Sequence, residues 1–413
     1  MALTSLDILR ISEPVEQMYM DCAAQLLVNI CSHFKSDKKL AIADWETQKL
    51  SELGALTDES IAIIAKTTGK SEKEIKKAVF AGMEKEVSAA EAVLSQAASA
   101  GKIQGVYTSW EASESVKAVL NNLTGQAVEH SNIVNTVMLQ STRTRYINAI
   151  QFAVTEELAL IERLQSASSI EMLDDQLART QRALNASTMS VATGAETREA
   201  ALRRTVKQLA KQGITGYIDA GGHHWSPEAY INMDIRTTVH NAAIQGQKAR
   251  SADYGVYVFQ ISSHAGARPL CAPYQGKFYS WNDDSGVVED RQGNRYKYEP
   301  IKNTSYGQAA GIFGINCGHR PNTFISGYSK ARFEPTEDEA ENTRLYQLSQ
   351  DQRQKERAIR NEKTAALCYE AAGDKEAAAA ATKRAREKSA EYRAFCKAND
   401  ITPRMNRTMI AST

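Results

Sequence analysis

Residues 256–281 read VYVFQISSHAGARPLCAPYQGKFYSW, and this stretch decides the fold class because it begins the only convincing β-sequence in the chain. Three segments have the β-branched or aromatic composition of strands: Val256–Ile261, Lys277–Trp281 and Arg295–Glu299. Turn-forming residues at 283–286 and 291–294 separate them. We therefore expect a small antiparallel sheet, flanked by the preceding helix, within residues 250–330.

The first two hundred residues, in contrast, have the periodicity of helices. Between residues 144 and 165, apolar side chains recur at steps of three and four: Ile147, Ile150, Val154, Leu158, Ile161 and Leu164. Ser71 and Glu74 match a capping box, which predicts that a helix begins there. Glycines such as Gly69 and Gly125 interrupt the pattern, so that no heptad repeat persists. These features predict a bundle-like region of helices with short connections.

Helices are also expected directly before and after the sheet. Ser226 and Pro227 form a helix start, and the helix should run to about Arg250. After the sheet, one helix should end near Ala372 and a second should span Lys375–Lys397. The sequence thus predicts a mainly α protein with a small α+β domain. We divide it into a helical N-terminal region, an α+β core and a helical C-terminal tail: residues 1–212, 213–332 and 333–413.

Charge and hydropathy exclude some classes of partner. The chain has 50 Lys and Arg against 49 Asp and Glu, a formal net charge of +1. So small a charge produces no overall field that would attract nucleic acid or a membrane surface, and such a partner would need a local patch. Residues 1–10 lack the pattern of an export signal, and no apolar run approaches the about 20 residues of a membrane span. We expect synthesis in the cytoplasm, with cysteines as thiols or metal ligands.

Two histidines and two cysteines near the sheet carry metal-ligand chemistry: His264, Cys271, Cys317 and His319. Two imidazoles and two thiolates can complete a closed tetrahedral zinc site. Their spacing differs from the paired knuckles of common zinc modules, and buried cysteines beside histidines that bond loop backbone would give the same pattern. A cysteine nucleophile activated by an imidazole is a third interpretation. The glycines of residues 307–314 fit neither phosphate-binding fingerprint, which favours a flexible or close-packed loop.

A basic stripe lies on the helix that follows the sheet. Its members are spaced to share one face: Arg353, Arg357, Arg360 and Lys363. The stripe could bind DNA phosphates or an acidic partner. Glu356 and Glu362 are interleaved with it, however, and the alternative is a solvated face with local ion pairs.

Three strings connect the chain to a known family. They are SSHAGARPLCAPYQGKFYS at 262–280, YGQAAGIFGINCGH at 306–319, and Q-x-x-x-E-R-x-I-R-x-x-K at 352–363. The N-terminal half adds weaker matches, among them Asn122–Gly125. Together these strings resemble the second minor-capsid family of tailed bacteriophages, which is similar in turn to the MuF-like head-morphogenesis proteins. The specific part of the resemblance rests on six core positions: Gly266, Arg268, Pro269, Gln275, Gly276 and Asn316.

The resemblance implies a structural virion protein made in the host cytoplasm. It implies several copies at the portal vertex of the head, with the portal protein and the capsid shell as partners, and a part in head assembly, DNA packaging or delivery. Weak DNA contact and a structural zinc ion are compatible with it. Family members often have histidine where Cys271 stands, which keeps metal-ligand character, whereas arginine is common at Gly318. The alternative is an enzyme: a zinc-dependent hydrolase or a nuclease-like toxin module built on the His/Cys core.

Overall fold

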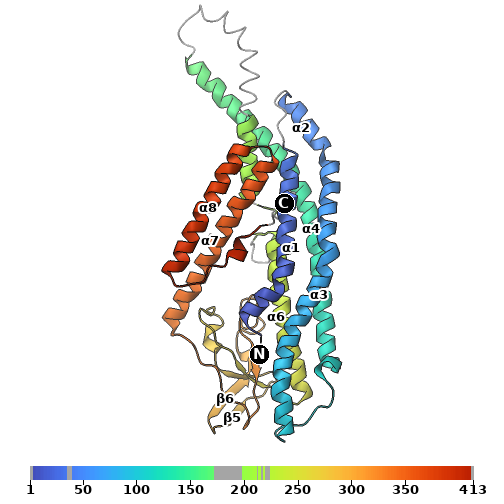
Figure 1. Ribbon diagram of the computed structural model, residues 1–413, viewed down its shortest axis with the longest axis vertical. Coiled ribbons are helices and arrows are strands. Elements are labelled where there is room, and N and C mark those ends of the chain that lie inside the picture. The colour runs from blue at the N-terminus through green and yellow to red at the C-terminus, as the bar shows by residue number, and fades with distance from the viewer. Residues whose placement is uncertain are drawn as a thin grey trace, which may run out of the picture. The chain divides into compact units, whose positions relative to one another are not determined.

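The computed structural model describes residues 3–34, 40–171, 198–211, 213–214, 217–218 and 224–410, and most of them are helical (Figure 1). The labelled helices are α1 (Ser5–Ser32), α2 (Ile42–Ser51), α3 (Leu53–Ser99), α4 (Glu114–Glu171), α6 (Pro227–Asp253), α7 (Glu339–Ala371) and α8 (Lys375–Ala398). Residues 198–211 are helical as well. Together with one small sheet, these helices confirm the predicted fold class, mainly α with a small α+β region.

The chain forms two compact units, each assembled from separate stretches. The first unit comprises Met1–Tyr19, Thr68–Ile133 and Glu228–Arg353. The second comprises Met20–Thr67, Val134–Pro227 and Gln354–Thr413. The three consecutive parts expected from the sequence stay a prediction. No helix among the described residues is long and apolar enough to cross a membrane.

A five-stranded sheet belongs to the first unit, in the order β5-β6-β4-β3-β7. Its strands are β3 (Val258–Ile261), β4 (Phe278–Ser280), β5 (Gly286–Glu289), β6 (Arg295–Pro300) and β7 (Pro321–Thr323). The expected sheet was antiparallel throughout, but β4 and β6 pair in parallel. The β5–β6 hairpin returns β6 to the free edge of β4, where Tyr296 stacks on Phe278 with ring centroids 4.7 Å apart. A separate two-stranded pairing joins β1 (Tyr217–Ile218) to β2 (His224–Trp225).

Helix α6 provides the central apolar face of the first unit. Its apolar stripe is 0% exposed at every position: Ile231, Ile235, Val239 and Ala242. Helix α3 approaches α6 closely, because a Cβ added at Gly246 would lie only 2.8 Å from Cγ of Met83. On the sheet side, Ile244 of α6 packs in one buried cluster with Phe259 and Ile261 of β3. The sheet is therefore anchored on a helix that is itself buried on several sides.

The second unit has an aromatic core and a C-terminal helical hairpin. The ring of Phe34 lies 6.3 Å from that of Trp45 and 5.5 Å from that of Tyr146. Figure 1 shows α7 and α8 side by side, as the two predicted C-terminal helices. The Tyr392 hydroxyl of α8 donates to Oε1 of Glu356 on α7 at 2.9 Å, and both side chains are buried. This buried hydrogen bond joins the two helices of the hairpin, α7 and α8.

Two sequence-based predictions about helix ends were wrong. Ser71 lies in the interior of α3, where its side chain is 1% exposed and its hydroxyl donates to the Thr68 carbonyl. Gly69 and Gly125 lie inside α3 and α4 instead of ending them. A glycine in a helix costs about 1 kcal/mol relative to alanine. That cost is small beside the burial of a long helix face, so packing overrides the local signal.

Candidate functional site

The pairing of β3 with β7 brings two loops to the same end of the sheet. In the antiparallel register Ile261, the last residue of β3, lies opposite Pro321, the first residue of β7. His264 follows β3 closely and His319 precedes β7 closely, so the two histidines meet. Their ring centroids are 4.3 Å apart. Residues separated by more than fifty positions are thus brought together by sheet pairing.

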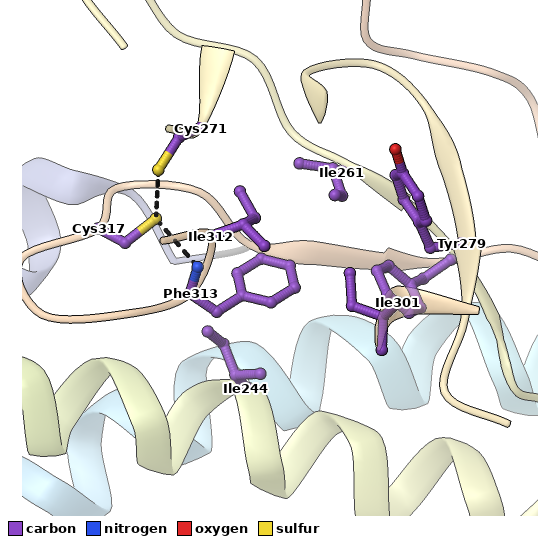
Figure 2. Packing of buried hydrophobic residues seen from close by; sticks show 9 residues of the cluster. Ile244, Ile261, Cys271, Tyr279, Ile301, Ile312, Phe313 and Cys317 are labelled. Carbon is purple, nitrogen blue, oxygen red and sulfur yellow. Dashed lines mark hydrogen bonds between the residues drawn. The ribbon is translucent and has the colours of Figure 1, made fainter. Parts of the chain in front are cut away.

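The two cysteines reach the same place from separate loops. Figure 2 shows the Cys271 and Cys317 sulfur atoms facing each other, with a separation of 3.9 Å. The Cys317 Sγ also lies 3.4 Å from Nδ1 of His319. Within the described parts of the chain, the donor atoms of these three residues form a group in which all lie within 4.8 Å of one another. Cys271, Cys317 and His319 are 1%, 5% and 1% exposed, so the group is inside the protein.

Gln275 fixes the orientation of both histidines. Its Oε1 accepts a hydrogen bond from the backbone N–H of His264 at 2.7 Å and another from Nε2 of His319 at 3.2 Å. Because Nε2 of His319 carries the proton, a neutral ring presents the lone pair of Nδ1 to Cys317. In His264, Nδ1 donates to the Ala265 carbonyl at 3.1 Å, which leaves Nε2 unprotonated. That Nε2 is buried and has no hydrogen-bond partner.

The two thiols differ in their acidity. Hydrogen bonding to Cys317, with burial acting in the same direction, raises the pKa of Cys271. The hydrogen bond from Cys271 lowers the pKa of Cys317 and outweighs its burial. Burial also lowers the pKa of His240, whose Nε2 donates to the His319 carbonyl at 2.7 Å. The hydrogen bond from Cys271 therefore favours negative charge on Cys317.

A strained loop holds Cys317 in place. Phe313 and Asn316 both have positive φ, 60° and 53°, a conformation that is rare for residues with a side chain. The strain allows the Phe313 N–H to donate to Cys317 Sγ at 3.3 Å (Figure 2). The loop packs on itself, since a Cβ at Gly311 would lie 1.8 Å from the Ser305 carbonyl oxygen. Close packing, one of the two alternatives expected for this loop, therefore explains Gly311.

The motif residues of the core build this environment in two ways. Gly266 and Gly276 have positive φ, and a Cβ at either would press on backbone, in the case of Gly276 at 2.7 Å from the Phe333 carbonyl oxygen. Arg268 donates to the Ile315 carbonyl at 2.8 Å and so joins the Cys271 loop to the Cys317 loop. Pro269 is exposed beside Arg268. Most of the motif thus shapes the loops that carry the cysteines and histidines.

Comparison with known proteins assigns the chain to a family. A family model described as "Phage minor capsid protein 2" matches residues 4–169 and 178–397. The chain belongs to this family. The minor capsid protein is also similar to a "Structural protein" of Lactococcus phage LL-H, with 33% identity over 222 residues. That match covers 54% of this chain and 58% of the relative, so it spans little more than half of either protein. No solved structure matches the minor capsid protein.

The family and its relative confirm the coarse expectation from the sequence. This minor capsid protein is a structural protein of a bacteriophage and a component of the virion. The role of the residues expected to carry chemistry stays a prediction: His264, Cys271, Cys317 and His319.

The basic stripe of the minor capsid protein is partly occupied by contacts within the second unit. Arg360 donates to the Arg407 carbonyl, and Lys363 donates to the Thr408 carbonyl at 2.7 Å. Burial lowers the pKa of Lys363. Arg353 and Arg357 are exposed on the same helix, α7. Two of the four side chains thus hold the C-terminal segment, and phosphate contact by the stripe stays a prediction.

Sequence reasoning missed a second pair of cysteines in the minor capsid protein. Cys31 of α1 and Cys368 of α7 are both 0% exposed and hydrogen-bonded to each other, which raises the pKa of Cys31 together with burial. Nothing in the local pattern of either helix could have revealed the pair, because the contact depends on how the helices of the second unit pack.

Proposed function

We propose that this minor capsid protein is a structural component at the portal vertex of the phage head, present in several copies, that acts in head assembly, DNA packaging or delivery. Membership of the minor capsid family supports the virion part of this proposal. The resemblance to MuF-like head-morphogenesis proteins supports the portal part. Portal protein and capsid shell are the expected partners.

The burial of the His/Cys group is the observation that favours a structural role over the enzyme alternative. An enzyme needs its nucleophile or its metal-bound water to meet substrate. Cys317 is instead packed in one cluster with Ile244, Ile312 and Phe313. A substrate would have to displace this core before it could reach the sulfur atom. The group is therefore better suited to holding loops together than to turnover.

A surface hollow on the helical part of the first unit suggests where a partner could dock. It has a volume of about 560 Å³ and is lined by side chains of α3 and α4, among them Phe80, Asn121 and Thr124. Gly125 also lines it, although a Cβ there would meet nothing within 4 Å. Packing inside this chain therefore gives no reason for a glycine in mid-helix. Close approach of another protein would give one.

The test is a binding measurement with a matched pair of glycine variants. Gly69 is also an exposed glycine in a helix interior with open space around it, but it is not part of the hollow. Both Gly69→Ala and Gly125→Ala should stabilise the isolated chain by about 0.5–1 kcal/mol, because alanine is the better helix former. In pull-down with the purified portal protein, only Gly125→Ala should bind more weakly.

Two outcomes would contradict the proposal at different levels. Equal binding by both variants would remove the hollow as the contact surface while leaving portal association intact. Failure of the native chain to bind either portal or capsid shells would refute the portal role itself. The position of the chain in a reconstruction of the virion by electron microscopy gives an independent answer, since density away from the portal vertex would also refute it.

A further inference from the structure

We propose that Cys271, Cys317, His319 and His264 bind one zinc ion in a buried structural site. The inference concerns the stability of the core and is independent of portal association. It rests on four observations about the described residues: the distances between donor atoms, the tautomers of the two histidines, the charge of the complete ligand set, and the strained loop that presents Cys317.

The distances match the edges of a zinc tetrahedron. With Zn–S bonds of about 2.3 Å and Zn–N bonds of about 2.05 Å, tetrahedral angles place two sulfur ligands about 3.8 Å apart and a sulfur and a nitrogen about 3.6 Å apart. Cys271 Sγ and Cys317 Sγ are 3.9 Å apart. Cys317 Sγ and His319 Nδ1 are 3.4 Å apart. Two of the three edges among these donor atoms therefore have coordination spacing, and the third, between Cys271 Sγ and His319 Nδ1, is within 4.8 Å.

The hydrogen bond made by the His319 ring is of the kind that a metal-bound histidine makes. A histidine that binds a metal generally donates its other ring N–H to a carbonyl or carboxylate, which fixes the ring and its tautomer. His319 does this through Nε2 to the amide oxygen of Gln275, itself 4% exposed. The Phe313 N–H directed at Cys317 Sγ is a donor of the kind that stabilises a bound thiolate. Two residues of this loop have positive φ, a strained conformation that brings the Phe313 N–H to the sulfur atom.

His264 is the side chain placed to supply the fourth ligand. Its ring lies against that of His319, with centroids 4.3 Å apart. Its unprotonated Nε2 is buried without a partner, which is costly for a nitrogen lone pair unless something binds it.

The charge of the complete set suits a buried site. Two thiolates with two neutral imidazoles balance the charge of Zn²⁺. The neutral complex avoids the cost of burying net charge. Four protein ligands also leave no open coordination position, so the site is structural rather than catalytic.

The experiment measures metal content and coordination in the full chain. We expect one zinc ion per chain by elemental analysis after purification under reducing conditions. X-ray absorption should show two sulfur and two nitrogen ligands. After exchange of zinc for Co²⁺, the spectrum should show sulfur-to-cobalt charge transfer and the intense visible bands of tetrahedral cobalt.

Substitutions separate this site from a general effect on folding. Cys271→His should keep the metal while lowering the sulfur count from two to one, a change that misfolding cannot imitate. Gln275→Leu removes the acceptor shared by His319 Nε2 and the His264 backbone N–H, and should weaken zinc affinity by about 10- to 100-fold. Cys396→Ser alters a buried cysteine of the second unit and should leave metal content and the absorption spectrum unchanged.

Three results would overturn the proposal. Freshly purified chain with far less than one zinc ion, and no uptake of zinc or Co²⁺ when either is added, would refute the site. A disulfide between Cys271 and Cys317 in protein isolated without reductant, found by peptide mass mapping, would replace it. Two sulfur ligands with one nitrogen ligand and a water, unchanged in His264→Ala, would refute the assignment of His264.

Discussion

The buried ion pair between Glu157 and Arg198 should be one of the most sensitive points of the second unit. Glu157 lies on α4, and the two side chains are 3% and 4% exposed. Arg198 donates to both carboxylate oxygens, at 2.9 and 3.1 Å, and also to the Leu40 carbonyl at 2.8 Å. Glu157→Met would leave a guanidinium in the core without its counter-charge. Breaking a buried pair in this way costs about 3–5 kcal/mol.

The double variant gives the opposite expectation. When both partners become apolar residues of similar volume, no charge remains buried, and such replacements are often close to neutral. Glu157→Met with Arg198→Met should therefore recover most of the stability that either single variant loses. The coupling between the two substitutions should be about as large as the loss from one of them.

Hydrogen exchange is the suitable assay because the chain has two compact units, and a single global transition would mix them. Amides of residues 150–160 and 198–211 should exchange about 10²- to 10⁴-fold faster in each single variant, which is the loss of 3–5 kcal/mol expressed as an opening constant. Protection in β3 and β4 should not change. Single variants within 1 kcal/mol of the native chain, or a double variant that loses the sum of both, would refute the reasoning.

Three further predictions concern the first unit. Gly246→Ala should lower the melting temperature, although alanine has the better helix propensity. The new Cβ would lie 2.8 Å from Met83 Cγ, and overpacking of this kind costs about 1–3 kcal/mol. An unchanged or higher melting temperature would contradict the close packing of α3 and α6. Burial acts to raise the pKa of Asp7, but hydrogen bonds from Lys85 and Thr4 prevail and lower it to about 2. A lowered carboxylate pKa stabilises the fold above the unfolded value of about 3.9 and loses that contribution as pH falls towards 2, so Asp7→Asn should be less stable than the native chain at pH 7 and equal to it near pH 2 in denaturant titrations. Asn342→Ala removes both hydrogen bonds to the buried backbone of Ala267, each 2.7 Å long, and should lower stability by about 2–4 kcal/mol. The loss should appear as faster amide hydrogen exchange in the loop that contains His264. Unchanged protection of that loop would show that water replaces the side chain.

Much of the fold could be predicted where local pattern and tertiary packing agree. The helix from Pro227 and the strands around Phe259 and Phe278 lie close to where the sequence placed them. The short strands β5 and β7 were missed, because three or four residues carry too little pattern to be separated from turns. The parallel pairing of β4 with β6 was also missed, since the choice between the free edges of a sheet depends on distant aromatic contacts.

The prediction of which helix face is buried was wrong where a charged residue occupies the core. Leu158 belonged to the predicted apolar stripe, yet it is 47% exposed while its neighbour Glu157 is buried. The buried face of α4 is turned by about one residue, because Glu157 has Arg198 as a partner and a paired charge can take a core position. No count of apolar residues along α4 contains this information. The partner lies forty-one positions away in the sequence.

The sequence predicted which residues form the candidate site but not how they are arranged. The residue types of His264, Cys271, Cys317 and His319 pointed to zinc, while their spacing argued against the common zinc modules. The structure explains the unusual spacing, because the ligand loops are joined by the pairing of β3 with β7 and not by a local knuckle. The roles of Gln275 and of the strained Phe313 loop could not be read from sequence, since both depend on the orientation of backbone groups.

A metal cross-link would also account for how so small a sheet holds a strained loop. The two positive-φ residues near Cys317 cost about 1–3 kcal/mol each. Cys271 and Cys317 are separated by 46 positions. Closing a loop of that length with a covalent tie reduces the entropy of the unfolded chain by about 4 kcal/mol at 25 °C, and a metal with ligands at both ends acts in the same sense. That gain has the same magnitude as the strain. Strands of three to six residues supply little stability of their own, so a tie at the end where β3 meets β7 stabilises the part of the core that hydrogen bonding supports least.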